Sequence, residues 1–451
     1  MQNKNHLARY SQAKKVIRSV ILGEAINSNK NKALILNLAK QTIYIHEYPL
    51  SKKAKIALVI PYHPLYEIGG LEIGTMQIAK NLMKLGQKVE IVSKAVYPRK
   101  DFSGIFYTSD GIRVNGIGKG IEDIISFLFS KVHEYDVIQW MEIFPPIPEK
   151  PYIYNDKAEQ QYLASVLLRF LGKKVYLYVA TSGNVTSRGT NNPLWNCSFP
   201  QSLNVLLKSG FTGFNFANPQ IALEYKKIGL KISKRRMAFI PFGVDINKFY
   251  PVNKNNQLKL REKLNFPKDK IIFFYLGRFV TRKRPDVLLD IWNTLSSETL
   301  KKSHLIFIGG RTAIGQPDSI YGAVQKQILT SKEVTSFDNV SHKQMPKYIQ
   351  ACDIMIFPSE REGWPLALME AMACGKIILS SNIDCVKNII DSSDKGLLFE
   401  TRDFNTMTEN IINLSKNFLS YKHLGKNARN TVVYKYSWEI VSKKYLSFFR
   451  R

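Results

Sequence analysis

The chain has 451 residues, of which 45% are hydrophobic, 12% aromatic and 22% charged, and this composition is typical of a folded protein with two or three domains. No apolar run approaches the ~18–20 residues that a membrane-spanning helix needs, and the N-terminus lacks the apolar segment of a signal peptide. We therefore predict a cytoplasmic protein.

The chain is strongly basic, with 65 lysine and arginine residues against 36 acidic residues and a formal net charge of +29. Nucleic-acid binding is not expected, because the sequence has neither zinc-finger spacing nor an RNP-type aromatic strand. Two interpretations stay open. Basic patches are attracted to anionic membrane surfaces without inserting into them, and a lysine-rich composition also simply keeps a protein soluble.

The sequence suggests neither a metal site nor a disulfide framework. Its four cysteines have no CxxC spacing, its seven histidines form no HExxH pair, and DxD does not occur. Because Cys352, Cys374 and Cys385 lie in or beside apolar segments, we expect buried thiols. We expect no cofactor and no metal.

Residues 1–50 are predicted to form a basic N-terminal extension. Val16, Ile17, Val20, Ile21 and Ala25 fall on one helical face beside basic residues, which indicates a basic amphipathic helix. Such a helix packs on the following domain or lies on a membrane surface, and we favour packing. The segment 42–46 is typical of a strand.

Residues 51–245 are predicted to form a first α/β domain. The apolar run 55–61 is typical of a strand buried in a parallel sheet, and a loop with Gly69 and Gly70 follows it. This loop lacks GxGxxG, and no acidic residue ends the next strand, so a dinucleotide site is not supported. After the loop we expect a helix over 75–86 and strands over 88–93, 136–140, 175–180, 213–217 and 238–241.

A segment rich in Pro, Gly and Asn, residues 241–257, is predicted to connect the first domain to a second. Strands and helices then alternate again, which indicates a second Rossmann-like, doubly wound domain over residues 246–432. Its strands are expected at 271–277, 304–310, 334–340, 353–358, 376–380 and 396–399. The apolar period of the C-terminal segment predicts a helix over 436–449, within a final element of residues 433–451.

Two stretches of the second domain combine charge with a predicted helix start. Arg278 follows Gly277 at the end of a buried strand, and Lys283 lies just before a helix opened by Pro285. Two cations there suit a diphosphate, although a solvated basic turn is the alternative.

The second of these stretches, residues 353–380, is predicted to be strand, loop, helix and strand. Pro365 is expected in the first turn of the helix and Gly375 at its C-terminal cap. Glu362 lies in the loop before this helix and Glu370 lies within it. Carboxylates beside a helix N-terminus can accept hydrogen bonds from sugar hydroxyls, and a Rossmann unit with surface acids is the alternative.

Taken together, these motifs resemble those of the retaining, nucleotide-sugar-dependent family-four glycosyltransferases of the GT-B fold. The resemblance covers roughly residues 55–449. It rests on the glycine loop at 64–82, IPFGVDINKF at 240–249, LGRFVTRKRPDVLL at 276–289, and the E-x7-E signature of Glu362 and Glu370. It implies two Rossmann-like domains facing across a cleft, with the C-terminal helix crossing back to pack on the first domain.

The resemblance also implies roles for individual residues. Arg278, Lys283 and Glu362 would be catalytic, with the two cations stabilising the departing diphosphate, and Glu370 would bind ribose hydroxyls. The donor-binding set would be Gly69, Gly70, Gly277, Arg278, Lys283, Glu362, Gly363, Trp364, Leu366 and Glu370. Acceptor-side candidates are His63, Glu67, Ser182 and Asn184.

The sequence departs from the family pattern at several positions. Ser182-Gly183 stands where many members have His-Gly, which leaves the transferred sugar open. Pro365 replaces the second glycine of the family's EGFG, which removes one backbone N–H, and Ala367 replaces a proline.

We therefore expect a hexosyltransferase that needs no metal, uses a UDP-sugar, and acts in polysaccharide or glycoconjugate biosynthesis. Its acceptor would be a glycan, a glycolipid or a lipid-linked molecule at an anionic cytoplasmic membrane face, where the protein would be peripheral. Two alternatives stay open: a GT-B disaccharide synthase or phosphorylase with a small soluble acceptor, and a non-catalytic protein that binds sugar nucleotides.

Overall fold

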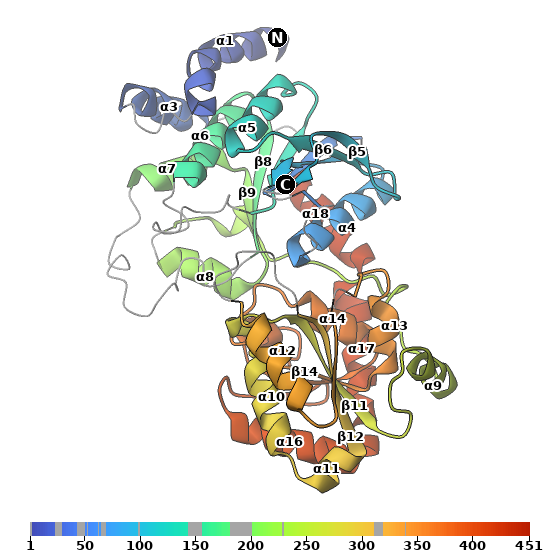
Figure 1. Ribbon diagram of the computed structural model, residues 1–451. Coiled ribbons are helices and arrows are strands. Elements are labelled where there is room, and N and C mark those ends of the chain that lie inside the picture. Colours follow the sequence, from blue (N-terminus) through green and yellow to red (C-terminus); the bar gives the residue numbers. More distant parts are fainter. Residues whose placement is uncertain are drawn as a thin grey trace. The chain divides into compact units, whose positions relative to one another are not determined.

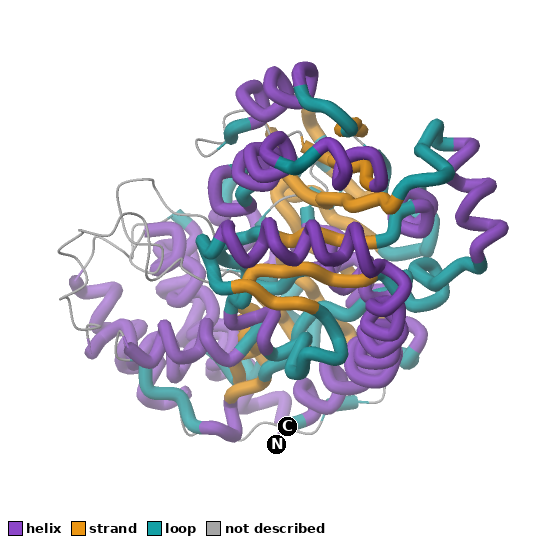
Figure 2. The backbone as a smooth tube through the Cα atoms, turned by 90° about the horizontal axis from the view of Figure 1, so that it is seen from below, coloured by secondary structure: helices purple, strands orange, loops and turns teal. Residues whose placement is uncertain are grey.

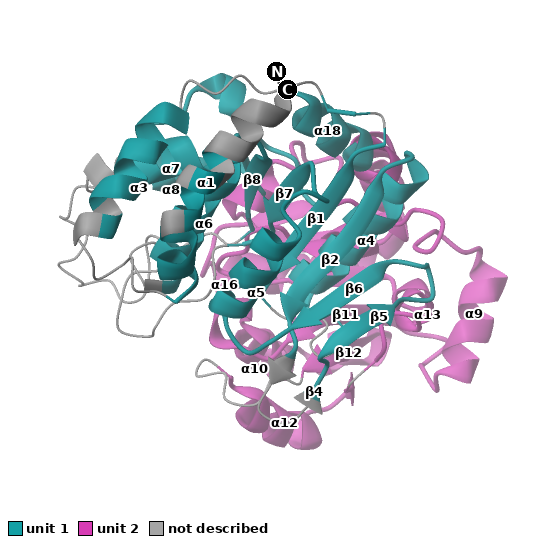
Figure 3. Cartoon of the chain, turned by 90° about the horizontal axis from the view of Figure 1, so that it is seen from above, with its two compact units in different colours: residues 1–242, 441–451 teal, residues 243–440 magenta. Residues whose placement is uncertain are grey.

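The computed structural model describes residues 2–22, 29–42, 50–51, 53–61, 63–64, 69–97, 100–142, 156–180, 201–227, 230–310, 319–338 and 340–451. The chain forms two compact units, coloured separately in Figure 3: unit 1 is Met1–Phe242 with Val441–Arg451, and unit 2 is Gly243–Ile440. Each unit has a largely parallel sheet with helices packed on it (Figures 1 and 2). The predicted class, two parallel-sheet α/β domains, is confirmed.

The main sheet of unit 1 has the strand order β10-β9-β8-β7-β1-β2-β6-β5, and all neighbours are parallel except β5 and β6. Its strands are β1 (Lys55–Ile60), β2 (Lys88–Lys94), β5 (Gly104–Tyr107), β6 (Arg113–Ile117), β7 (Val137–Trp140), β8 (Lys174–Val179), β9 (Gly213–Phe216) and β10 (Met237–Ala238). A separate ribbon pairs β3 (Val96–Tyr97) with β4 (Lys100–Asp101).

Strands β5 and β6 were not among the predicted strands. Strand β5 is short, mostly exposed and at the edge of the sheet. The sequence of β6 lacks a continuous apolar run, because Asn115 and Gly116 interrupt its middle. Both residues have structural reasons to be there. The Asn115 side chain donates to the carbonyl of Ile91 over 3.2 Å, and a Cβ at Gly116 would lie 1.9 Å from the carbonyl oxygen of Phe102.

The helices of unit 1 pack on this sheet and on one another. They are α1 (Gln2–Ile21), α3 (Asn29–Thr42), α4 (Gly70–Lys84), α5 (Ile121–Ser130), α6 (Asp156–Phe170), α7 (Gln201–Gly210), α8 (Pro219–Lys227) and, from Val441 onward, α18 (Trp438–Arg450). Helix α4 begins five residues before the predicted start. No helix in the described ranges is both long enough and apolar enough to span a membrane.

The N-terminal helix α1 packs on unit 1 through its apolar face. Val16 and Val20 are buried, and α1 contacts α5 and α6 (Figure 1). The buried amide of Gln160 donates to the carbonyls of Val20 and Ile21 over 2.9 and 2.8 Å, which satisfies the last turn of α1. Of the predicted strand at 42–46, Thr42 instead ends helix α3, and residues 43–46 lie outside the described residues.

The C-terminal helix α18 packs on the sheet of unit 1. The Tyr176 hydroxyl donates to the carbonyl of Phe449 over 3.1 Å, and the Tyr445 hydroxyl donates to the carbonyl of Ile240 over 3.3 Å. The ring of Tyr176 also lies 5.0 Å from that of Phe448. Residues far apart in sequence are thereby joined, so the last eleven residues complete the fold of the first unit.

The sheet of unit 2 is wholly parallel, with the strand order β13-β12-β11-β14-β15-β16. Each strand overlaps one of the predicted strands, although β13 contains Thr335 and Ser336 instead of a continuous apolar run. The strands are β11 (Ile271–Arg278), β12 (Ser303–Gly310), β13 (Val334–Phe337), β14 (Ile354–Phe357), β15 (Ile377–Ser381) and β16 (Leu397–Phe399).

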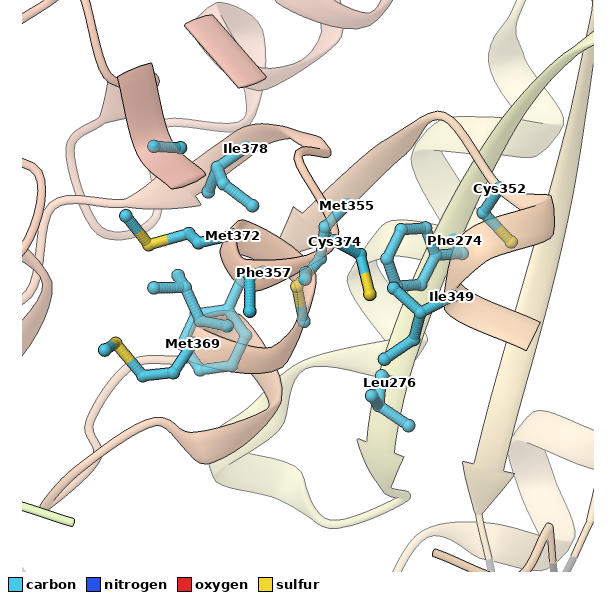
Figure 4. Packing of buried hydrophobic residues seen from close by; sticks show 14 of the residues in the cluster. Phe274, Leu276, Ile349, Cys352, Met355, Phe357, Met369, Met372, Cys374 and Ile378 are labelled. Atoms are coloured by element: carbon cyan, nitrogen blue, oxygen red, sulfur yellow. The ribbon is translucent and has the colours of Figure 1, made fainter. Parts of the chain in front are cut away.

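Hydrophobic clusters cover both faces of this sheet because alternate side chains of each strand point to opposite faces. One cluster joins Phe274, Met355 and Phe357 to Met369 and Met372 of α14 (Figure 4). The other buries Phe273, Ile356 and the helices on the opposite face. The helices of unit 2 are α9 (Lys254–Lys263), α10 (Pro285–Thr294), α11 (Ser297–Lys302), α12 (Tyr321–Thr330), α13 (Met345–Ala351), α14 (Leu366–Ala373), α15 (Asp384–Lys387), α16 (Phe404–Asn417) and α17 (Lys422–Tyr436).

Candidate functional site

Most of the predicted donor-site residues lie at one edge of the unit 2 sheet. The strands are parallel, so the loops that follow β11, β13 and β14 all leave from the same edge, where ligands of open α/β sheets bind. Arg278 ends β11, and Lys283 ends a 3-10 turn, Thr281–Lys283, that directly precedes α10. Glu362 lies in the loop between β14 and α14.

The turn after β11 is held against the loop after β14. The backbone N–H of Glu360 donates to the carbonyl of Arg282 over 2.8 Å. The Lys283 side chain passes beside Gly277, where an added Cβ would lie 3.4 Å from Lys283 Cδ, and its Nζ lies 5.7 Å from the centre of the Phe357 ring. These contacts fix the position of the lysine before any ligand arrives.

Glu362 is paired with two cations. Its Oε1 lies 2.6 Å from Lys283 Nζ and 3.0 Å from Arg282 Nη1. Burial raises the pKa of Glu362, but Lys283 and Arg282 outweigh this and set the pKa at about 2. Burial also lowers the pKa of Lys283, although Glu362 acts in the opposite direction. Two cations share one carboxylate, so this cluster has a local excess of positive charge.

Helix α14 begins at Leu366, one residue after the position expected from Pro365. Pro365 is the N-cap, with φ −89° and ψ 80°, so the prediction that it lies in the first turn is wrong by one residue. Gly363 is buried just before it. The Trp364 ring packs 5.3 Å from the ring of Tyr436, and the N–H of Leu366 donates to the carbonyl of Trp364 over 3.2 Å.

Gly375 follows the C-cap of α14 with φ +69°, as predicted. The second acidic residue of the signature, Glu370, lies in this helix and is only 7% exposed. Its Oε1 lies 2.7 Å from Nε2 of His342, which comes from the loop between β13 and α13. The two glutamates therefore have different partners: Glu362 contacts basic side chains after β11, and Glu370 contacts an imidazole after β13.

The described site residues of unit 1, His63, Gly69 and Gly70, lie between β1 and the start of α4. The N–H of Gly69, the N-cap of α4, donates to Oε2 of Glu72 over 3.0 Å, and Gly70 is exposed at the first position of that helix. His63 is buried, stacked 4.8 Å from the ring of Phe102, and burial lowers its pKa to about 4. It is therefore neutral near pH 7. Glu67, Ser182 and Asn184 lie outside the described residues.

Sequence reasoning did not assign three polar residues that the structure places in these clusters. Arg282 was given no role of its own, yet it contacts Glu362. His342 and Lys248 were not considered, and their side-chain nitrogens, Nδ1 and Nζ, lie 3.1 Å apart. The position of His342, five residues after the carboxyl end of β13, is the signal that could have identified it. Within the described ranges, no group of three or more His, Cys, Asp or Glu residues could hold a metal ion.

Comparisons with known proteins bear on both units. Residues 256–431 match the family described as "Glycosyl transferases group 1". A similar curated protein is the N,N'-diacetylbacillosaminyl-diphospho-undecaprenol alpha-1,3-N-acetylgalactosaminyltransferase of Campylobacter jejuni, which is 27% identical over 53% of this chain. Another is the UDP-Gal:alpha-D-GlcNAc-diphosphoundecaprenol alpha-1,3-galactosyltransferase of Escherichia coli, 24% identical over 47% of this chain.

These matches cover 60% and 54% of the two relatives, so the chain spans little more than half of their length. Among solved structures, the sucrose-phosphate synthase of Thermosynechococcus elongatus superposes with a TM-score of 0.67 at 20% identity, covering 88% of this chain and 98% of that one. This similarity confirms the predicted GT-B fold. The predicted resemblance to these transferases is confirmed as well.

Proposed function

Because residues 256–431 match the group 1 glycosyl transferases, we propose that the protein is a retaining hexosyltransferase that uses a nucleoside-diphosphate sugar, with UDP as the expected nucleotide. The proposed acceptor is a glycan, a glycolipid or a lipid-linked molecule. The names of the two relatives support the lipid-linked class, since both name a diphospho-undecaprenol acceptor, and one names UDP-Gal as the donor.

The observation that carries this proposal is the cluster of Lys283, Arg282 and Glu362. Breaking the glycosidic bond of the donor leaves negative charge on the departing diphosphate. Cations that are already in position lower this barrier, because they need not reorganise as the charge develops. Glu362 holds two cations in place but neutralises only one charge, so the cluster can bind an anion. This supports a transfer reaction that does not depend on a metal.

Within the proposed site, the diphosphate binds the cations after β11, and the donor sugar lies near Glu362 and the backbone of Gly363, Trp364 and Leu366. Arg278 and Gly277 line the phosphate end, and Glu370 accepts hydrogen bonds from the ribose. We assign acceptor recognition to unit 1. The parts of His63, whose side chain is buried against Phe102, and of Gly69, Gly70, Glu67, Ser182 and Asn184 stay predictions.

Peripheral contact with an anionic membrane is part of the proposal. The apolar side chains Val16 and Val20 of α1 are buried, whereas Lys14 and Arg18 are exposed. Attraction would therefore be electrostatic, without insertion of the helix. Vesicles with anionic lipid should bind the protein at low salt and release it at high salt. Equal binding to neutral vesicles would contradict this part.

A transfer assay tests the function directly. The protein is incubated with radiolabelled UDP-, GDP- or ADP-sugars and lipid-linked acceptors, in EDTA, and Lys283→Met is the matched variant. We expect label in the lipid fraction with the wild-type protein and a large loss with the variant. Tight binding of nucleotides with no transfer or hydrolysis under any condition would instead favour a sugar-nucleotide-binding protein.

A further inference from the structure

Glu370 is held by a partner that the proposed mechanism does not use. The imidazole Nε2 of His342 lies 2.7 Å from Glu370 Oε1, and the side chains are 23% and 10% exposed. The two residues are 28 positions apart: His342 lies in the loop between β13 and α13, and Glu370 lies in helix α14. A contact this short on a mostly buried carboxylate restricts the orientation of that carboxylate.

A third residue, Lys248, determines which nitrogen of His342 carries the proton. Lys248 Nζ lies 3.1 Å from Nδ1 of His342. An ammonium group can only donate hydrogen bonds, so Nδ1 must accept, and the proton of the neutral ring is then on Nε2. Nε2 therefore donates to Glu370. The three side chains form a directed chain in which Lys248 donates to His342 and His342 donates to Glu370.

The segment that carries Lys248 is anchored at several points. Asp245 Oδ1 accepts from the N–H groups of Asn247 and Lys248, each over 3.1 Å. Arg429 donates to the carbonyls of Phe249 and Ala373 over 2.7 and 2.6 Å, which ties the segment to the end of α14, the helix that bears Glu370. The Phe249 ring lies 5.6 Å from that of His342. The imidazole is thus held by its surroundings.

We propose that His342 is a positioning residue for recognition of the donor ribose. It binds one oxygen of Glu370, Oε1, and so aims the other oxygen, which keeps its own lone pairs, at a ribose hydroxyl. Lys248 supports this by fixing the tautomer that donates. The inference rests on the proposed function, because it assigns the ligand of the same site as a nucleoside diphosphate.

A purely structural role for His342 makes a different prediction, and the ligand itself can separate the two. If His342 only links a loop to α14, its removal weakens every nucleotide equally or none of them. If it aims Glu370 at the ribose, its removal weakens only those ligands that carry the hydroxyl. The effect of the variant should therefore depend on whether the hydroxyl is present.

Calorimetric titration of the full chain with UDP, 2′-deoxy-UDP and 3′-deoxy-UDP is the test, with the GDP and ADP series if those bind more tightly. The wild type should prefer the ribonucleotide over one deoxy analogue by roughly 10–100-fold, as expected for a hydrogen bond to a carboxylate. His342→Ala should reduce that preference to less than about threefold while binding the deoxy analogue nearly as tightly as the wild type does. His342→Gln, whose Nε2 can also donate, should restore part of the preference.

The outcomes separate the inference from the proposed function. If wild-type protein prefers the hydroxyl and His342→Ala keeps that preference, the inference is wrong and the proposed function stands. A uniform loss across all ligands would likewise assign His342 a structural role. If the wild type binds no nucleoside diphosphate, the proposed function fails, and the inference with it. Should His342→Ala not fold, Lys248→Met provides the same comparison. It removes the ammonium group that fixes the tautomer of His342 but keeps the imidazole ring.

Discussion

Two groups of charged residues lie at opposite ends of the unit 2 sheet, and they differ in how their cations are bonded. At the amino end of β14, Arg261 pairs with Asp353 over 2.5 Å, and their side chains are 1% and 7% exposed. Arg261 also donates to the carbonyls of Ala351 and Lys270, each over 2.9 Å. Asp353 accepts from the N–H of Ile272 over 2.8 Å and from Gln257 over 2.9 Å. Gln257 and backbone groups thus satisfy the rest of this pair. The buried ammonium of Lys376, which lies nearby, donates to the carbonyls of Gln350 and Cys352 over 2.9 and 2.7 Å.

At the carboxyl end of the same sheet, one carboxylate oxygen of Glu362 is shared by Lys283 and Arg282. The Arg261–Asp353 pair joins three segments of the chain, and the neighbouring Lys376 is bonded to carbonyls, as buried structural charges must be to offset the cost of burial. In the group at the carboxyl end of the sheet, two cations, Lys283 and Arg282, share the single negative charge of Glu362. We conclude that the Arg261–Asp353 pair stabilises the fold. The group of Lys283, Arg282 and Glu362 instead leaves positive charge that a ligand can bind.

The largest effect on stability is expected from Arg261→Met. It leaves Asp353 buried without its cation, and breaking a buried pair in this way costs about 3–5 kcal/mol of unfolding free energy. Urea unfolding followed by circular dichroism measures the loss. The control is Lys268→Ala, which breaks an exposed pair with Glu262 at 3.0 Å and should cost under about 1 kcal/mol. Similar losses in the two variants would remove the distinction between the ends of the sheet.

Unlike Arg261→Met, Lys283→Met should cause a large loss of transfer activity and little loss of stability. Arg282 remains to pair with Glu362, so we expect the unfolding free energy to change by about 1 kcal/mol or less. Transfer should fall by roughly 10²–10³-fold, the size of effect seen when one charge-stabilising group is removed from an active site. Initial-rate assays and urea unfolding on the same preparation measure both. A variant that unfolds readily but transfers normally would contradict the assignment.

Acid should weaken the pairing of Glu362 with Lys283 and Arg282 over a defined pH range. The pKa of Glu362 is lowered from its ordinary 4.5 to about 2, so its contribution to stability is complete above pH 4.5 and is lost as the pH falls toward 2. Between those values the wild type should lose on the order of 3 kcal/mol more unfolding free energy than Glu362→Gln, since each pKa unit is worth about 1.4 kcal/mol. Parallel acid profiles for the two proteins would show that the pairing contributes nothing.

The smallest effect is expected at Glu370. Glu370→Gln keeps the shape of the side chain but removes a charged acceptor, which is worth about 1.5–3 kcal/mol in binding. The Kd for UDP should rise roughly 10–100-fold, while binding of inorganic pyrophosphate, which has no ribose, stays unchanged. If pyrophosphate binding weakens to the same extent as UDP binding, Glu370 acts on the phosphate end and the division between the two glutamates is wrong.

The sequence was informative where one segment alone determines the structure. Continuous apolar runs predicted β1, β11, β12 and β14, because strands buried on both faces have few polar positions to interrupt the run. It failed at β6, where Asn115 and Gly116 are explained only by contacts with Ile91 and Phe102. In the candidate site, too, residues close in sequence could be predicted and contacts between distant residues could not. Arg278 and Lys283 follow a strand closely in sequence, whereas the contacts of His342 with Glu370 and Lys248 join residues 28 and 94 positions apart.

Titration of the full chain with UDP and with uridine, for the wild type and Lys283→Met, tests the central claim most directly. If the carboxyl-end cations are kept for a diphosphate, the wild type should bind UDP far more tightly than uridine, and Lys283→Met should lose most of that difference while binding uridine as before. Unchanged affinity of Lys283→Met for UDP would contradict the claim that this cluster binds the diphosphate.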